Sequence, residues 1–250
     1  MTVLGNGPGT VAPTGGEVGR GLAKRVLLPS IILWLTVFGI GYLVVEVFNF
    51  DEHGVSQHFV DMRTDQWDAV TGFVSAMGST MVLTGTCTVI VLLIWWQSRQ
   101  WWYAIVPGIS LTVQVSVFLS TSVLVGRERP DVIQLDDAPP TSSFPSGHTG
   151  ATASVYLAVA LCATRIQTTW LRVTVQVVCV LVPLGVALSR VYRGMHHPTD
   201  VAAGLMIGAA CAVIAWNWLP TRTRAHARQA GVGAQNDAVT HTSALVELRR

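Results

Sequence analysis

Long apolar stretches separated by short polar ones dominate the pattern along this chain. A helix that spans a bilayer needs about 20 mostly apolar residues, within a range of roughly 17–25. Six apolar stretches follow one another, at about residues 26–48, 77–96, 102–125, 149–164, 171–188 and 201–219, and all but the fourth reach that length. The fourth is the shortest. The pattern therefore predicts an all-α polytopic membrane protein, a bundle of six transmembrane helices.

The two ends of the chain differ from this apolar middle. Residues 1–20 are rich in Gly, Pro and Thr, which is typical of a disordered segment, and they lack the pattern of a signal peptide. Residues 220–250 are polar and are interpreted as a tail. We therefore expect one membrane domain, at residues 21–219, between two polar ends.

Composition supports a membrane protein and excludes several other classes. Of the 250 residues, 50% are hydrophobic and only 12% are charged, against about 25% charged in a typical soluble domain. The net charge of +2 gives no indication of a nucleic-acid partner. The four cysteines all fall inside apolar stretches and show no metal-ligand spacing. Oligomeric state is not indicated.

Basic residues near the apolar stretches predict the orientation, because they accumulate on the cytoplasmic side. One side of the six-span arrangement carries nine Lys or Arg residues near the spans and the other carries five. This favours cytoplasmic termini in a plasma membrane of bacterial type, with the polar tail in the cytoplasm. The minority side also holds five acidic residues and His53 and His58 in its first loop. That loop is interpreted as solvated, with a lid over a substrate as the alternative.

Three polar segments fall on the minority side: "VGRERP", "FPSGHT" and "SRVYRGMHHPTD". With six spans, the loops after the third and fifth spans face the same side of the membrane. One face is thus expected to bring together the polar residues of all three segments, namely Arg127, Arg129, Ser146, His148, Arg190, His196 and Asp200.

This set of residues suits a phosphate. Arginine guanidinium groups match phosphate oxygens bidentately and stay charged. Gly147 stands just before a predicted helix, where free backbone N–H groups favour an anion, and Ser146 adds a hydroxyl donor. No carboxylate cluster or histidine triplet is present to hold a metal ion, so neither a metal nor another cofactor is expected.

The histidines add chemistry to this cradle. Pro198 suits the first turn of the sixth span, and Asp200 then lies close enough to accept a hydrogen bond from a ring nitrogen of His196. A carboxylate behind an imidazole fixes its tautomer and stabilises its charged form. The other nitrogen of His196 could attack phosphorus, and His148 could protonate the leaving oxygen.

In these motifs the chain resembles the type 2 phosphatidic acid phosphatase family, which shares its site with vanadium haloperoxidases. The family's motifs are KxxxxxxRP, PSGH and SRxxxxxHxxxD. The second is complete at residues 145–148, and the third is complete from Ser189 to Asp200. The first retains only Arg129 and Pro130, with Ser122 at the lysine position. We expect Arg127 to supply the missing charge to the phosphate.

The resemblance implies metal-independent hydrolysis of a lipid phosphate or diphosphate at the extracytoplasmic membrane face. His196 would be the nucleophile that forms a phosphohistidine, Asp200 would orient it, and His148 would be the acid and base. Arg129, Arg190, Ser146 and the Gly147 amide would hold the phosphoryl oxygens. The class includes phosphatidic acid, phosphatidylglycerol phosphate and polyprenyl diphosphate. A lipid-phosphate-binding protein without activity and a vanadate-dependent haloperoxidase remain the alternatives.

Overall fold

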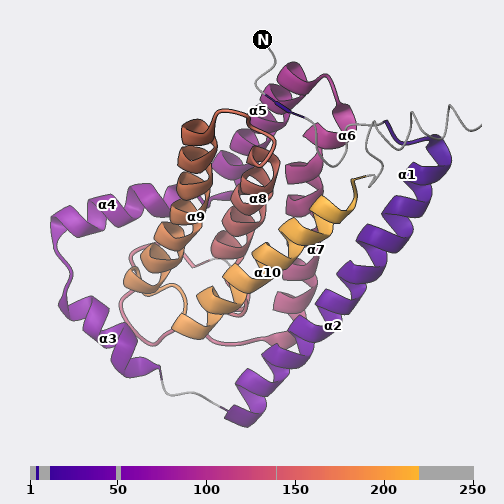
Figure 1. Cartoon of the computed structure of the whole chain (residues 1–250). Helices are drawn as coiled ribbons and strands as arrows, with labels where there is room; N and C mark the ends of the chain where they lie inside the picture. The colour runs from indigo at the N-terminus through magenta and orange to yellow at the C-terminus, as the bar shows by residue number, and fades with distance from the viewer. Residues whose placement is uncertain (1–3, 6–11, 49–51, 139, 220–250) are drawn as a thin grey trace, which may run out of the picture.

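A computed structural model describes residues 4–5, 12–48, 52–138 and 140–219. Throughout these residues the regular elements are helices, and the only extended pairing is an isolated bridge between Leu4 and Ile166. The all-α fold class is therefore confirmed (Figure 1). The predicted tail at 220–250 lies outside the described residues, as does much of the segment predicted to be disordered.

The helices follow one another along the chain with short connections. In order they are α1 (Gly15–Gly21), a π-helical stretch (Leu22–Leu27), α2 (Leu28–Tyr42), a second π-helical stretch (Leu43–Phe48), α3 (His53–Asp61), α4 (Asp65–Ala76), α5 (Thr80–Ser98), α6 (Trp101–Ala104), α7 (Val106–Val125), α8 (Gly147–Ala163), α9 (Thr169–Tyr192) and α10 (Pro198–Asn217).

Among the described residues, five helices are long and apolar enough to cross a membrane, so the predicted count of six is not confirmed: Gly15–Val47, α5, α7, α9 and α10. The helix α8 corresponds to the fourth predicted span and has only 17 residues. The first helix begins at Gly15, where the Thr14 side chain accepts a hydrogen bond from the backbone N–H of Glu17 and so caps the helix. Residues 15–20 are thus helical, although they fall within the segment predicted to be disordered.

The helix α8 lies at the centre of the bundle, against α7, α9 and α10. The backbones of α8 and α10 are in close contact, because glycines face each other there. A Cβ atom built on Gly208 would lie 2.6 Å from the carbonyl oxygen of Gly150, and one on Gly204 would lie 2.8 Å from that of Ser146. Only residues without side chains allow this approach. The contact fixes the start of α8 beside the start of α10.

The first loop on the minority side contains the helices α3 and α4, which the prediction of a solvated loop missed. Thr64 begins α4 by accepting a hydrogen bond from the N–H of Trp67. The side chain of Tyr192, at the end of α9, donates to the carboxylate of Asp68 over 2.8 Å. Acidic residues in this segment suggested a solvated loop, whereas one of them binds α4 to α9.

The polar segments meet at one end of the bundle. The helices α7 and α9 end there, and α8 and α10 begin there, at the lower end of the bundle in Figure 1. The antiparallel course of these four helices therefore produces the convergence that the spacing of the motifs predicts.

Candidate active site

A cavity of about 340 Å³ opens at this end of the bundle, between α5, α7 and α8. Five residues of the predicted site line it: Arg129, Gly147, His148, Arg190 and His196. They come from the loop after α7, the first turn of α8, the end of α9 and the loop before α10. The structure thus brings both histidines and two arginines to one cavity.

His196 is held in one tautomer by the backbone. Its Nδ1 lies 2.8 Å from the carbonyl oxygen of Ser143, and a carbonyl only accepts, so Nδ1 carries the proton. The lone pair is then on Nε2. Burial lowers the pKa of His196 below its usual value, despite the nearby carboxylate of Asp200. The ring is therefore neutral near pH 7, as a nucleophile must be.

Asp200 does not make the predicted hydrogen bond to His196. The nearest separation, from Oδ2 of Asp200 to Nδ1 of His196, is 3.8 Å, which is an electrostatic contact and too long for a hydrogen bond. Oδ2 instead accepts from the Ser143 hydroxyl over 2.5 Å and from the backbone N–H of His197 over 2.9 Å. The second bond caps the first turn of α10, which begins at Pro198 as predicted. Asp200 thus holds Ser143, whose carbonyl orients the nucleophile.

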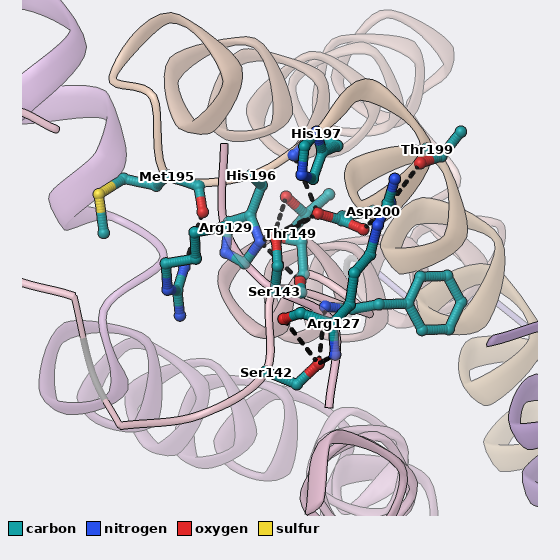
Figure 2. Close-up of polar contacts among 12 residues, drawn as sticks. Arg127, Arg129, Ser142, Ser143, Thr149, Met195, His196, His197, Thr199 and Asp200 are labelled. Carbon is teal, nitrogen blue, oxygen red and sulfur yellow. Dashed lines mark hydrogen bonds and ion pairs between the residues drawn. The ribbon is translucent and has the colours of Figure 1, made fainter. Parts of the chain in front are cut away.

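Arg127 faces Asp200 and lines a neighbouring cavity, with Glu52 and Arg129, instead of the one that holds both histidines, so its predicted role as a phosphate ligand is not supported there. Its guanidinium donates to Oδ1 of Asp200 over 2.5 Å and to the hydroxyl of Thr199 over 2.6 Å. The carboxylate of Glu52, just before α3, lies 3.5 Å from the same guanidinium. Figure 2 shows Arg129 and Arg127 on opposite sides of the group formed by His196 and Asp200. A buried carboxylate without a cation is strongly disfavoured, so Arg127 pairs with Asp200.

Ser146 also departs from its predicted role. Its side chain is fully buried, and the hydroxyl donates to Oγ1 of Thr149 over 3.0 Å in the first turn of α8. The hydroxyl of Ser122, at the motif position of the lysine, is likewise turned to its own helix, where it donates to the carbonyl oxygen of Leu119. Neither residue lines the cavity.

The two cavity arginines keep donors free in different ways. Arg190 uses one terminal nitrogen for the Ser75 hydroxyl (2.8 Å) and for the carboxylate of Asp136 (2.7 Å). Its Nε is buried without a hydrogen-bond partner. Arg129 is anchored by the carbonyl oxygen of Met195 over 2.7 Å. Burial lowers the pKa of Arg129, but an arginine remains charged in proteins. Both guanidinium groups can therefore still donate to an anion.

Asp136 joins Arg190 to Arg193. Arg193 donates to both carboxylate oxygens of Asp136, over 2.6 and 2.9 Å. Partial burial opposes ionisation of Asp136, but the hydrogen bonds of Arg193 and the charge of Arg190 outweigh it and lower the pKa of this carboxyl. Asp136 is therefore ionised and shared between two cations.

Four supporting residues were missed in the sequence: Glu52, Ser75, Asp136 and Ser143. Ser143 stands two residues before the PSGH motif, which is the one local signal that could have drawn attention to it. The other three come from segments distant in sequence and acquire their roles only through packing.

His148 lies in the first turn of α8, and the turn between α4 and α5 packs on it. A Cβ atom built on Gly78 would lie 3.3 Å from that of His148 and 3.0 Å from Oγ1 of Thr152. The position of the imidazole therefore depends on a glycine at residue 78. Among the described residues, no group of three or more His, Cys, Asp or Glu side chains is placed to hold a metal ion.

Comparison with known proteins identifies this arrangement. Residues 102–224, which include the whole of α7 to α10, match the model of the PAP2 superfamily. Residues 102–224 of the chain belong to the PAP2 superfamily. The chain is 35% identical over 119 residues to the decaprenylphosphoryl-5-phosphoribose phosphatase of Mycobacterium tuberculosis. That match covers 46% of this chain and 59% of the relative, so the chain spans about three fifths of the relative's length.

Solved structures share the fold. The transmembrane PAP2-type phosphatidylglycerolphosphate phosphatase of Bacillus subtilis has a TM-score of 0.66 at 20% identity, over 76% of this chain and 94% of that one. LpxE of Aquifex aeolicus has a TM-score of 0.53 at 19% identity, over 65% of this chain and 92% of that one. At these identities the similarity concerns the fold alone.

Proposed function

We propose that the protein is an integral membrane phosphatase that hydrolyses a lipid phosphate or diphosphate through a phosphohistidine, without a metal ion. The observation that carries the proposal is the common cavity of His148, His196, Arg129 and Arg190, which has apolar walls on one side. The phosphatase name of the mycobacterial relative supports the same class of reaction.

The reaction proceeds in two steps. Nε2 of His196 attacks phosphorus while the bond from phosphorus to the leaving oxygen breaks, and His148 gives that oxygen a proton. Water then attacks the phosphohistidine, His148 takes the proton of the water, and the bond from phosphorus to nitrogen breaks. Asp200 stabilises the positive charge on His196 across 3.8 Å. Arg129, Arg190 and the Gly147 amide hold the phosphoryl oxygens.

The walls of the cavity favour a lipid. Beyond His148 the cavity continues along α5 and α7, past Leu83, Val115, Phe118 and Leu119. These helices are apolar and long enough to cross a bilayer. A phosphate bound at the membrane surface would then leave its lipid tail among apolar side chains.

The proposal includes six crossings, with α8 as the short one inside the bundle. A helix of 17 residues is about 26 Å long, a little less than the hydrocarbon core of a bilayer. The excess of basic residues at the opposite end favours cytoplasmic termini and an extracytoplasmic site in the plasma membrane.

Phosphate release by the purified protein tests the activity. The panel contains phosphatidic acid, phosphatidylglycerol phosphate, a polyprenyl phosphate and a polyprenyl diphosphate. We expect turnover of at least one substrate in EDTA, and inhibition by vanadate at the phosphoryl site. No release from any substrate would support a binding protein without activity, and a loss in EDTA that Mg²⁺ reverses would contradict the mechanism.

Cysteine labelling tests the orientation. The four native cysteines are buried and unpaired, so the background is low. Gly54 in α3 has open space around it, and Thr168 is exposed at the opposite end of the bundle. In intact cells an impermeant thiol reagent should modify the variant Gly54→Cys and spare Thr168→Cys. The reverse result would place the site on the cytoplasmic side.

A further inference from the structure

We infer that this site cleaves phosphomonoesters, in which the leaving group is an uncharged alcohol, and discriminates against lipid diphosphates. The inference rests on the proposed function and narrows it to one class of substrate. It follows from where the positive charges at this end of the bundle are directed.

Only two of the arginines at this end line the cavity, namely Arg129 and Arg190. Arg127 is turned to Asp200 and Glu52 on the other side of the nucleophile. These two carboxylates offset its charge, and it lines a second cavity with Glu52 and Arg129, not the one that holds both histidines.

Two further arginines are bound elsewhere. Arg193 makes a bidentate pair with Asp136 and also donates to the carbonyl oxygen of Asp68 over 3.0 Å. Arg63 donates to the carbonyl oxygens of Ile133 (2.7 Å) and Tyr192 (3.0 Å). Both guanidinium groups hold the outer loops together and do not line the cavity.

The part of the cavity that would receive the leaving group carries no charge on the described residues. Its walls on α5 and α7 are Leu83, Thr84, Leu111, Val115, Phe118 and Leu119. The motif lysine that could have supplied a charge from α7 is Ser122, which faces its own helix. The single lysine of the chain, Lys24, lies in the first π-helical stretch, next to Arg25, whose side chain donates to the carbonyl oxygen of Leu219 at the opposite end of the bundle.

The charge balance suits one phosphate and not two. A phosphomonoester carries about −1.5 to −2 at pH 7. The two positive charges of Arg129 and Arg190 match that charge, although the carboxylate of Asp136 already neutralises part of the charge of Arg190. The second phosphate of a diphosphate would bring further negative charge among apolar walls, where an unpaired ion is strongly disfavoured. An alcohol brings no charge there.

The histidine on this wall agrees with an alcohol leaving group. His148 lines the cavity beside the apolar residues of α5 and α7. An alkoxide is a poor leaving group and needs a proton from a general acid. A phosphate leaves readily without one. A general acid on a wall that carries no cation therefore suits the cleavage of a phosphomonoester.

Two substrates with the same tail test the inference: dioleoyl phosphatidic acid and dioleoylglycerol diphosphate, in identical mixed micelles. We expect kcat/KM to be at least tenfold higher for the monophosphate, although the diphosphate has the better leaving group. An equal or higher value for the diphosphate would overturn the inference and leave the proposed function intact. Release from neither lipid, nor from the other lipid phosphates, would overturn both.

A charge added to the wall tests the cause. Thr80 is an exposed residue of the cavity lining, at the start of α5. Thr80→Arg should raise the ratio of diphosphate to monophosphate kcat/KM by fivefold or more, whereas the neutral control Thr80→Gln should leave it unchanged. The same ratio in the arginine variant and the wild type would contradict the electrostatic explanation.

Two more monoesters identify the alcohol: a polyprenyl phosphate and a prenyl-linked ribose 5-phosphate. Both satisfy the inference if they are cleaved faster than the diphosphate. Their ranking against phosphatidic acid shows whether the leaving group is a glycerolipid, a prenol or a sugar hydroxyl.

Discussion

The long helices of this chain are all apolar, but α10 near the C-terminus is buried far more than the two long helices of the first half, and α7 (33%) and α9 (22%) lie between them. In the most apolar window of α10, 56% of the residues are buried inside the protein, against 11% in α5 and 17% in the helix Gly15–Val47. The helices α8 to α10 pack on one another, and together with the loop before α10 they carry His148, Arg190, His196 and Asp200. Hydropathy therefore marks both halves as membrane segments, whereas the close packing of α8 against α9 and α10 distinguishes the half that holds the candidate catalytic groups.

The N-terminal half supplies the α5 wall of the cavity, and two of its polar side chains also bond to groups of the second half. Glu52 accepts hydrogen bonds from the backbone and side chain of Thr199, at the start of α10. Ser75, near the end of α4, accepts from Arg190. The first half thus positions groups that the second half supplies, and the comparison predicts unequal effects of substitutions in the two halves.

The largest effect should come from the nucleophile in the C-terminal half. His196→Ala should reduce turnover by a thousandfold or more, about 4 kcal/mol, and leave no acid-labile phosphoenzyme after rapid quenching. His58 is exposed in α3, and His58→Ala should retain activity as the matched control. Phosphate incorporated on His148 or His197 would contradict the assignment, and a large loss in His58→Ala would indicate a lid.

Glycine substitutions in the two halves should lower the thermal stability of the protein to different extents. Gly208→Leu forces a side chain against Gly150 and Ala153, where a Cβ alone would lie 2.5 Å from the Cβ of Ala153. Overpacking of this kind costs about 1–3 kcal/mol, so the thermal midpoint in detergent should fall by roughly 10 °C at the upper limit. Gly85 in α5 has open space around it, and Gly85→Leu should leave the midpoint unchanged. Equal shifts would refute the difference in packing.

Loss of the ion pairs of Arg127 with Asp200 and Glu52 should have a smaller effect. Arg127→Ala frees Asp200, so kcat should fall about tenfold, or 1.4 kcal/mol, with little change in KM. Arg127→Lys should recover part of the loss, and Glu52→Gln should cost less than Arg127→Ala. If instead KM rises and Ser122→Lys restores it, Arg127 binds the phosphate after all.

The smallest effect is a displacement of the pH profile. Burial lowers the pKa of His196, so the neutral nucleophile persists as the pH falls past the ordinary histidine value of about 6.5. The acid limb of kcat/KM, corrected for titration of the substrate phosphate, should therefore lie below pH 6.5. The measurement runs from about pH 4 to pH 8. An acid limb above 6.5 would mean that the charged ring is stabilised.

The sequence predicted the all-α class and most of the long helices because apolar stretches are a local signal. Apolar stretches of adequate length marked the spans, and Pro198 marked the start of α10. The amphipathic helices α3 and α4 were missed, since their acidic residues resemble a solvated loop. The partner of Arg127 was also missed, because Asp200 is 73 residues away and no local pattern shows which anion an arginine reaches.

By itself, the sequence determined that the chain is helical and apolar enough for a membrane, and that its polar motifs share one face. These properties depend on residue type, spacing and the parity of the spans. Only the tertiary structure decided that Ser143 orients His196, that Arg127 serves Asp200, and that two arginines face the cavity. The direction of a guanidinium or an imidazole is set by the nearest partner in space, and helix packing chooses that partner from distant parts of the chain.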